Sequence, residues 1–426
     1  MINMEQIKIL GTDQDLFLET LDNGLRVVLI PFENKNKYYA SYTTRYGSVD
    51  LDFFDESKNL ITTQKGIAHF LEHKMFEVES GDDPFTFFAK TGTGTNAGTS
   101  YKKTSYFIYG VNNLKENLDF LIDFVNTPYF TDENVEKEKG IIIEEIKMYD
   151  DNPDWIIAEE IQKSTFKNHP IRYDIAGYED TVSKITKEEL YNCYNTFYQP
   201  SNMLLVVSGN FKVDEIIDLI KKNKTLNVRK DKFEIKRKQI KEPKDIVEKF
   251  KEIKHSSVVI PKIAVDVKIS MENIKDKYKY YLYINALISI LFGSCSTFKE
   301  EMLKKGYITN LNVGRMIVDN YLLLEFYAEG NKYKDFVEEL KKCFSNEKVT
   351  KEEFERYKKV LIASLVMASD SIEEMASEVV EDFITWDKVI ENKIELVRNM
   401  EFNEFERIRK ETDFSKVATV VLKPTD

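Results

Sequence analysis

The chain has 426 residues, of which 42% are hydrophobic, and it carries a formal net charge of −12 at pH 7. This length favours more than one domain, and the hydrophobic fraction suffices for sizeable cores. The acidic charge argues against nucleic acid or an anionic membrane as a partner, and neither a membrane-spanning apolar run nor a signal peptide is expected. The three scattered cysteines, Cys193, Cys295 and Cys343, are typical of reduced thiols, so we expect a cytoplasmic protein.

The first predicted element is a β-hairpin at residues 16–31. Its centre is Asn23-Gly24, a dipeptide that favours tight turns between antiparallel strands. Alternating and helical periodicities predict the remaining elements of the first half. In chain order these are a strand at 38–45, a helix around 66–77, a strand at 105–110, helices at 114–125 and 133–149, and a strand at 203–208.

The helix around 66–77 contains the pattern His69-x-x-Glu72-His73, in a chain with only four histidines. At about 100° per residue, the three side chains share one helix face. Two neutral imidazoles can occupy two corners of a zinc tetrahedron, and the carboxylate between them can reach a metal-bound water. The alternative is a core-facing helix with two satisfied histidines, although paired histidines with an acid on one face rarely serve packing alone.

A catalytic zinc site needs a third protein ligand, and the helix at 133–149 is its best source. Glu138 and Glu145 fall on the mostly apolar stripe of this helix, whereas Glu144 is rotated by about 100° toward solvent. The stripe is formed by Val135, Glu138, Ile141, Ile142, Glu145 and Met148. Because an inward carboxylate is costly without a metal or a partner, we expect Glu145 to be the third ligand and Glu138 an outer group that supports the site. The alternative is a lysine-rich surface helix with incidental glutamates.

The pattern His69-x-x-Glu72-His73, followed by Glu145 in a Glu-x6-Glu pair, resembles the inverzincin metallopeptidases. This is the pitrilysin and insulin-degrading-enzyme (insulinase) family, which includes mitochondrial processing peptidase. The resemblance is strong over residues 20–210 and weak over the remainder, and it is closest to bacterial single-unit peptidases of about this length. Further segments similar to the family are Gly47–Asp50, Thr95–Ser100 with Thr104 and Tyr106, Asp151–Pro153 and Tyr198–Asn210.

The second half begins after a lysine-rich, weakly apolar stretch at 221–254, which predicts a linker. The order of elements then partly recurs. The predicted elements are a strand at 263–269, a helix at 280–291, a strand at 321–327, a helical tract at 350–412 and a strand at 418–422. This half has no second His-x-x-Glu-His pattern and no histidine beyond His255.

The resemblance implies an α+β fold of two related units, each an antiparallel sheet backed by helices, with metal in the first unit alone. We therefore expect an N-terminal zinc-binding peptidase domain at 1–220 and a charged linker at 221–254. A C-terminal metal-free domain at 255–426 would complete a substrate chamber.

The expected function is zinc-dependent hydrolysis of peptides or unfolded segments bound in extended form. One Zn²⁺ per chain would have as its ligands His69, His73 and Glu145. Glu72 would act as the general base. By the resemblance, Asn96 and Ala97 would bind an extended peptide as an added strand, although the same residues also fit an ordinary glycine-flanked turn.

One position departs from the family pattern. Relatives often carry an arginine seven residues before a tyrosine that contacts substrate, whereas this chain has Glu300 before Tyr307. A glutamate cannot donate to a developing oxyanion, so that role is absent, moved to a group such as Lys299 or Arg315, or supplied by another chain. Because the chain is about half the size of a family member that encloses substrate within one polypeptide, we expect a dimer, either with a metal-free homologue, which the Glu300 departure favours, or with a second copy. The alternatives to a peptidase are a catalytically silent structural or regulatory subunit and a peptide-binding protein.

Overall fold

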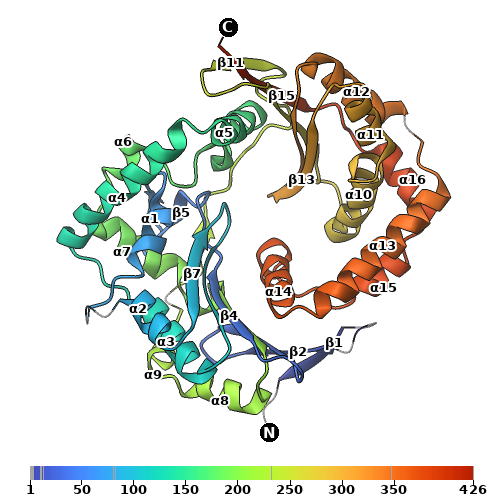
Figure 1. Ribbon diagram of the computed structural model, residues 1–426. Coiled ribbons are helices and arrows are strands. Elements are labelled where there is room, and N and C mark those ends of the chain that lie inside the picture. Colours follow the sequence, from blue (N-terminus) through green and yellow to red (C-terminus); the bar gives the residue numbers. More distant parts are fainter. Residues whose placement is uncertain are drawn as a thin grey trace. The chain divides into compact units, whose positions relative to one another are not determined.

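The computed structural model describes residues 4–9, 12, 14–79, 81, 83–231, 233–346 and 348–425 (Figure 1). The chain divides into two compact units, each assembled from three segments. Unit 1 consists of Met1–Ile146, Asp174–Gln239 and Val366–Asn392, and unit 2 of Lys147–Tyr173, Ile240–Leu365 and Lys393–Asp426. Each unit combines a sheet with packed helices, so the predicted α+β class is confirmed.

The units are not the continuous stretches expected from the sequence, at 1–220 and 255–426. Helix α5 (Pro153–Thr165) comes from the first half of the chain but packs on strands of unit 2. Helix α14 (Ile372–Trp386) comes from the second half but packs on strands of unit 1. The expected linker at 221–254 also contributes elements to both units. These are α9 (Lys224–Asn227) and β10 (Lys236–Arg237) in unit 1, and β11 (Lys251–His255) in unit 2.

Unit 1 is built on a seven-stranded sheet. Its strands in spatial order are β1 (Glu5–Lys8), β2 (Asp15–Thr20), β3 (Arg26–Pro31), β9 (Met203–Gly209), β4 (Tyr38–Thr44), β8 (Thr104–Gly110) and β7 (Gly94–Thr99). Neighbouring strands are antiparallel except β3 and β9, which run parallel. The predicted hairpin is present between β2 and β3. Its loop is Asp22-Asn23-Gly24, because the Leu21 N–H donates to the Leu25 carbonyl (2.8 Å) and Gly24 adopts a φ of +92°.

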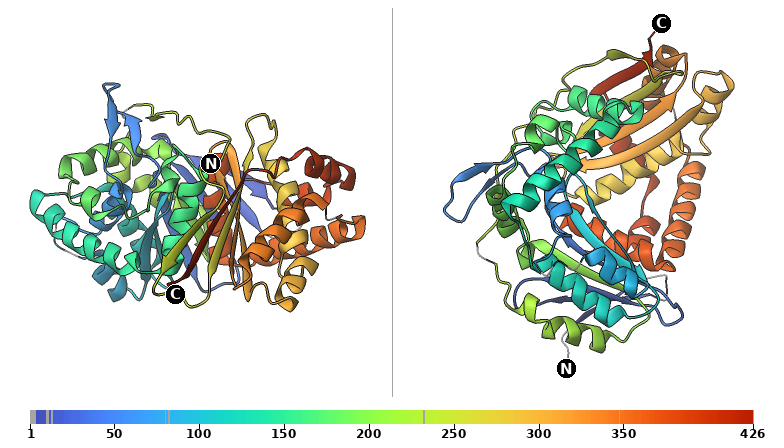
Figure 2. Two further views of the ribbon diagram at one scale, coloured as in Figure 1. Left: turned by 90° about the horizontal axis from the view of Figure 1, so that it is seen from above. Right: turned by 60° about the vertical axis from the view of Figure 1, so that its left-hand side comes forward.

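Both faces of this sheet are buried, which explains why all seven residues of β9 are buried and nearly all of them apolar. On one face, Val27, Tyr42 and Leu205 lie in a core with several helices (Figure 2). These helices are α1 (Ile67–Lys74), α3 (Leu114–Asn126), α4 (Asp132–Asp150), α7 (Lys187–Phe197) and α8 (Val213–Lys222). On the other face, Val206 packs with Phe383 of α14 in a separate cluster. A helix from late in the chain therefore completes the burial of the first sheet.

Unit 2 is built on a five-stranded sheet, coloured yellow to dark red in Figure 2. Its strands in spatial order are β11, β15 (Val417–Pro424), β12 (Lys262–Ser270), β14 (Tyr321–Glu329) and β13 (Asn310–Val318). The sheet is antiparallel as expected except for the parallel pair β11 and β15. One face packs on α10 (Lys277–Phe292), α11 (Thr297–Lys304), α12 (Tyr333–Asn346), α13 (Lys351–Ser369) and α16 (Phe402–Glu411), and the other on α5.

Further short elements belong to unit 1, except α15, which belongs to unit 2. They are β5 (Asp52–Phe54) and β6 (Leu60–Thr62), which pair with each other next to β10, and the helices α2 (Pro84–Lys90), α6 (Glu179–Val182) and α15 (Lys393–Arg398).

One stretch of the described chain, Lys277–Lys304, is long and apolar enough to cross a membrane, with a mean hydropathy of 1.4. The expectation that no such run exists was therefore too strong. The stretch covers α10 and α11, and buried residues of α10 such as Leu287 and Ile288 lie in the core of unit 2. A core helix passes the same test of length and composition, so this stretch is weak evidence for a span.

Candidate metal centre

Helix α1 carries the His-x-x-Glu-His pattern, and a close backbone contact fixes where this helix begins. Gly66, directly before the helix, has a φ of +89°, and a Cβ atom there would lie 2.2 Å from the Ala176 carbonyl oxygen. Gly177 approaches from the other side, with a φ of +78° and a virtual Cβ 2.4 Å from the Lys65 carbonyl oxygen. Only glycine fits such an approach. Within the helix, Phe70 and Leu71 are buried in the unit 1 core and anchor it.

Helix α4 supplies the acidic residues, and its predicted inward stripe divides into two. Val135, Glu138 and Ile142 are buried. In contrast, Ile141 is 49% exposed, Met148 is 76% exposed, and the Glu145 side chain is 30% exposed. The stripe of six residues is wider than the surface that α4 buries, so its edge stays open. Glu145 therefore lies at the boundary between the core and solvent, as a ligand in an accessible centre must. Glu144 is exposed, as its phase on the helix predicts.

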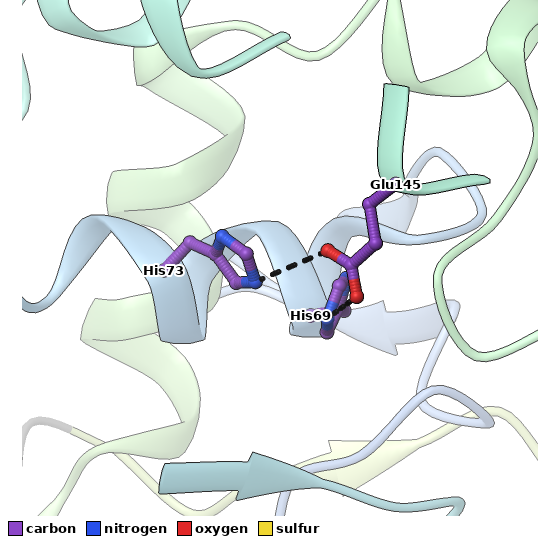
Figure 3. Close-up of side chains that lie close together, drawn as sticks. All are labelled: His69, His73 and Glu145. Carbon is purple, nitrogen blue, oxygen red and sulfur yellow. Dashed lines mark ion pairs between the residues drawn. The ribbon is translucent and has the colours of Figure 1, made fainter. Parts of the chain in front are cut away.

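The structure brings His69, His73 and Glu145 together. The His69 Nε2 atom lies 3.9 Å from Glu145 Oε1, and His73 Nε2 lies 3.6 Å from Glu145 Oε2. Figure 3 shows both imidazoles of α1 and the carboxylate of α4 pointing toward one another. All three candidate donor atoms lie within 4.8 Å of one another, and within the described ranges this is the one such group of His, Cys, Asp or Glu side chains.

The chemistry and spacing of this group fit a zinc ion. Two nitrogen donors and one carboxylate are a common ligand set for catalytic zinc, with the fourth position left for water. Donor atoms about 2.1 Å from a tetrahedral centre lie roughly 3.4 Å apart. The observed separations of 3.6 and 3.9 Å are close to that spacing and exceed the length of a direct hydrogen bond. The three side chains are therefore near enough to share one ion, but these atom pairs are too far apart for direct hydrogen bonds.

The pKa values of the two histidines are shifted in opposite directions. Burial, together with the neighbouring His73, lowers the pKa of His69 to about 3, so its imidazole is neutral at neutral pH. Neutral imidazole is the form that binds zinc. For His73, burial acts to lower the pKa, but a hydrogen bond with Glu138 and the nearby carboxylates outweigh it and raise the pKa. A bound cation would favour the neutral form of His73.

Glu138 orients His73. The Glu138 Oε1 atom lies 3.1 Å from His73 Nδ1, which leaves His73 Nε2 directed at the centre. Burial opposes ionisation of Glu138, yet the hydrogen bond from His73 and the charge of Lys74 lower its pKa. Glu138 is thus an ionised acceptor for the Nδ1–H of His73. This is the arrangement that fixes the tautomer of a metal-binding histidine.

Glu72 projects from α1 between the two histidines, and its residue is 9% exposed. The Thr99 hydroxyl, at the end of β7, donates to Glu72 Oε2 at 2.7 Å. Burial raises the pKa of Glu72 despite this hydrogen bond, and the carboxylate of Glu145 acts in the same direction. A raised pKa suits a carboxylate that must take and release a proton near neutral pH. Sequence reasoning did not single out Thr99, which was quoted only as part of a family-like segment.

Asn96 and Ala97 lie on β7, the last strand of the unit 1 sheet. Among the described strands β7 pairs with β8 alone, so one edge carries no strand. The Ala97 N–H donates to the Asn96 side-chain oxygen (2.9 Å). An extended peptide could therefore add to this edge by replacing that local bond.

The predicted residues of the second half have local partners within unit 2. Glu300 on α11 is exposed and forms an ion pair with Lys304 (2.5 Å). Tyr307 is half-buried in the turn after α11, with the ammonium of Lys332 5.5 Å from its ring centre. The two candidate replacements for the family arginine are also engaged: Lys299 donates to the Leu311 carbonyl (2.9 Å) and Arg315 to the Ser289 hydroxyl (2.8 Å). Their roles in catalysis stay predictions.

Comparisons with known proteins give a consistent result. A family model described as insulinase (peptidase family M16) matches residues 57–179, and a model described as the peptidase M16 inactive domain matches residues 184–361. The chain is 45% identical to an uncharacterized zinc protease of Bacillus subtilis, YmfH, over 69% of each chain. It is 24% identical to an uncharacterized zinc protease of Rickettsia felis, over 96% of this chain and 98% of the other. The crystal structure of an M16-like peptidase from Alicyclobacillus acidocaldarius is similar with a TM-score of 0.90 and 30% identity, over 98% of this chain and all of that one.

Proposed function

The chain belongs to the insulinase family, peptidase family M16, and we propose that it is a zinc-dependent endopeptidase. The observation that carries the proposal is the convergence of His69, His73 and Glu145 with the carboxylate of Glu72 beside them. The relatives named zinc proteases support the choice of metal. The substrate class is a peptide or an unfolded segment held in extended form.

The three ligands would hold one Zn²⁺ per chain, and the ion would supply a Lewis acid that lowers the pKa of a bound water to about 7. The Glu72 carboxylate takes the proton that the attacking water loses. The hydrogen bond from the Thr99 hydroxyl to Oε2 holds this carboxylate in place. Glu72 then passes the proton to the leaving nitrogen as the C–N bond breaks, which yields a carboxylate and an amine. Burial of Glu72 favours its protonated form and so helps it to accept the proton.

Substrate positioning is assigned to β7. An extended peptide would bind along its open edge through main-chain hydrogen bonds, with Asn96 and Ala97 as partners. Thr99 lies on the same strand and contacts Glu72. One strand therefore connects the predicted peptide-binding edge with the predicted base. Because such binding contacts mainly the backbone of the peptide, we expect no narrow sequence preference.

The second candidate is a protein of this fold that binds peptide or a partner without turnover. The second family model, named for an inactive domain, covers the half that lacks the His-x-x-Glu-His pattern. That name therefore does not concern α1. Retention of Glu72 favours an enzyme, since zinc binding alone has no need of that carboxylate.

Metal analysis combined with hydrolysis of an internally quenched peptide distinguishes these functions. The peptidase should contain one zinc per chain, lose activity on chelation and regain it on addition of zinc. A zinc-loaded protein that binds the peptide but never cleaves it would favour the silent binding protein. If the purified chain binds neither zinc nor the peptide, a structural subunit is favoured.

For assembly, we propose a dimer. One chain offers one unit with a metal centre and one unit in which the described residues form no such group. Glu300 stands where relatives often have an arginine, which favours a metal-free homologue as the partner over a second copy. Light scattering and activity of the chain, alone and with a metal-free relative from the same genome, test this. Full activity of a monomer would contradict both versions, and full activity of a homodimer would contradict the hetero-dimer.

A further inference from the structure

Lys74 is the last residue of α1, directly after the predicted ligand His73, and none of its surface is exposed. A fully buried ammonium group is costly unless ion pairs and hydrogen bonds replace its hydration. Lys74 has three such partners. Its Nζ atom donates to the Asn134 carbonyl (3.1 Å) and lies 2.6 Å from Glu77 Oε2 and 3.6 Å from Glu138 Oε2.

The contact with Glu138 links Lys74 to the metal centre. The Glu138 carboxylate uses its two oxygens for two different groups: Oε1 faces His73 Nδ1 at 3.1 Å, and Oε2 faces Lys74 Nζ at 3.6 Å. The carboxylate is held from both sides, so it has little freedom to rotate away from His73. Its side chain is 10% exposed, so water offers little replacement for either partner.

The contact with Glu77 has a different character. The Glu77 side chain is 35% exposed and lies on the solvent side of Lys74. Water can therefore reach this partner more readily than it can reach Glu138, whose side chain is 10% exposed. An apolar side chain at position 74 could fill the same space, so packing alone does not explain a lysine there. The buried carboxylate of Glu138 is therefore the group that requires a cation here.

The charges around the centre lead to the same conclusion. Glu72, Glu138 and Glu145 are three carboxylates close to two imidazoles. Lys74 contacts one of these carboxylates directly, with its Nζ atom 3.6 Å from Glu138 Oε2. Without Lys74, Glu138 would be a buried carboxylate free to compete for the metal or to take up a proton.

We propose that Lys74 is a positioning residue of the metal centre, which holds the second oxygen of Glu138 so that the first keeps His73 Nδ1 occupied and His73 Nε2 directed at the metal. The inference rests on the proposed zinc centre and goes beyond its ligands. It assigns to Lys74 a role transmitted through Glu138 and His73, with no contact to substrate.

The test measures zinc affinity by competition with a chelator, on full-length chains and without an activity assay. Lys74→Met should weaken zinc binding by about 10-fold or more, which is the range for groups that orient a metal ligand. Lys74→Arg should restore the affinity to within about threefold, because it keeps the cation. Glu77→Gln, the matched control, removes the exposed partner of Lys74 and should leave the affinity unchanged.

A double variant separates this role from a merely structural one. If Lys74 acts through Glu138, Lys74→Met should add almost nothing to the loss caused by Glu138→Gln. Additive losses, or wild-type affinity in Lys74→Met, would overturn the inference. If Lys74→Met does not fold, Lys74→Gln provides the same comparison, and failure of both to fold in zinc-free form would assign Lys74 to the fold and overturn the inference. Absence of zinc binding by the wild-type chain would instead contradict the proposed centre itself.

Discussion

Glu144 and Glu145 are neighbours on α4 that differ in their surroundings. The Glu145 carboxylate lies 3.6 and 3.9 Å from the two imidazole nitrogens, whereas Glu144 is exposed. Glu145→Gln should therefore weaken zinc binding strongly, because an amide is a poorer ligand than a carboxylate. Glu144→Gln is the matched control and should keep one zinc per chain. The zinc content of each variant after dialysis tests this prediction. Equal losses of zinc in the two variants would contradict the assignment of Glu145 as a ligand.

Thr99 provides a second test at the scale of one hydrogen bond. Its hydroxyl donates to the carboxylate of Glu72 at 2.7 Å, and a hydrogen bond to a charged group is worth about 1.5–3 kcal/mol. Thr99→Val should retain zinc and the folded structure but lower kcat by about 10-fold or more. Steady-state kinetics with one peptide, alongside metal analysis, measure both effects. Unchanged kcat would show that Glu72 needs no support from β7.

For single residues, the sequence was most informative where several functional side chains lie on one helix. The spacing of His69, Glu72 and His73 predicted their common face, and helical phase distinguished Glu145 from Glu144. Thr99 and Lys74 could not be found in the same way. Thr99 reaches Glu72 from a strand, and Lys74 reaches Glu138 from another helix, so both contacts depend on tertiary packing that local periodicity does not contain.

Among the elements, α1 depends most on one glycine. Gly66 has a φ of +89°, and an added Cβ would lie 2.2 Å from the Ala176 carbonyl oxygen. Gly66→Ala should shift the start of α1, lower the melting temperature and weaken zinc binding, since a left-handed conformation costs an alanine about 1–2 kcal/mol before any clash. Gly92→Ala is the control, because Gly92 has a φ of +69° and open space around it. Equal effects of the two substitutions would contradict the role of the close contact.

The paired strands β12 and β14 carry a buried acidic pair, Asp266 and Glu325, in direct cross-strand register. Burial raises the pKa of Glu325 to about 7, and burial together with the charge of Glu325 raises the pKa of Asp266. The folded state thus favours the protonated carboxyls. The stability associated with Glu325 is fully present below its ordinary pKa of 4.5 and is lost as the pH rises to about 7.

Glu325→Gln removes this titration. The variant should therefore gain unfolding free energy relative to wild type between pH 4.5 and pH 7.5. Denaturant unfolding at both pH values measures the difference. Glu300→Gln is the control, because its ion pair with Lys304 lowers the pKa of Glu300 and should give no such gain. A difference between Glu325→Gln and wild type that does not change with pH would show that the pair does not titrate in this range.

Periodicity predicted most elements well, and its failures have physical causes. The hairpin, the strands β4, β8, β9, β12, β14 and β15, and the helices α3, α4 and α10 lie within a few residues of their predicted positions. Strand β13 was missed because Asn and Gly are depleted in strands, and β14 supplies the pairing that stabilises it. On α4, helical periodicity predicted the phase of the stripe but not how much of its width is buried.

For the whole molecule, the two-unit α+β architecture was predictable and the continuous domain boundaries were not. The apolar face of α5 or α14 shows that a helix packs on something, but it does not say on which sheet. Ile157 and Ile161 of α5 pack with Ala264 of unit 2, and Val379 of α14 packs with Val206 of unit 1. The exchange means that neither half of the chain holds a complete unit, so we expect fragments cut near residue 240 to fold poorly.

Across these scales the account depends on one claim, that Glu72 is the base of a zinc peptidase whose ligands are His69, His73 and Glu145. The most direct measurement is the rate of hydrolysis of one internally quenched peptide by zinc-loaded wild-type chain and by zinc-loaded Glu72→Gln. The account predicts cleavage by the wild type and a rate lower by about 10²–10⁴-fold in the variant, with equal zinc content and equal peptide binding. Cleavage by the variant at more than about a tenth of the wild-type rate would contradict it, as would a zinc-loaded wild type that cleaves no peptide.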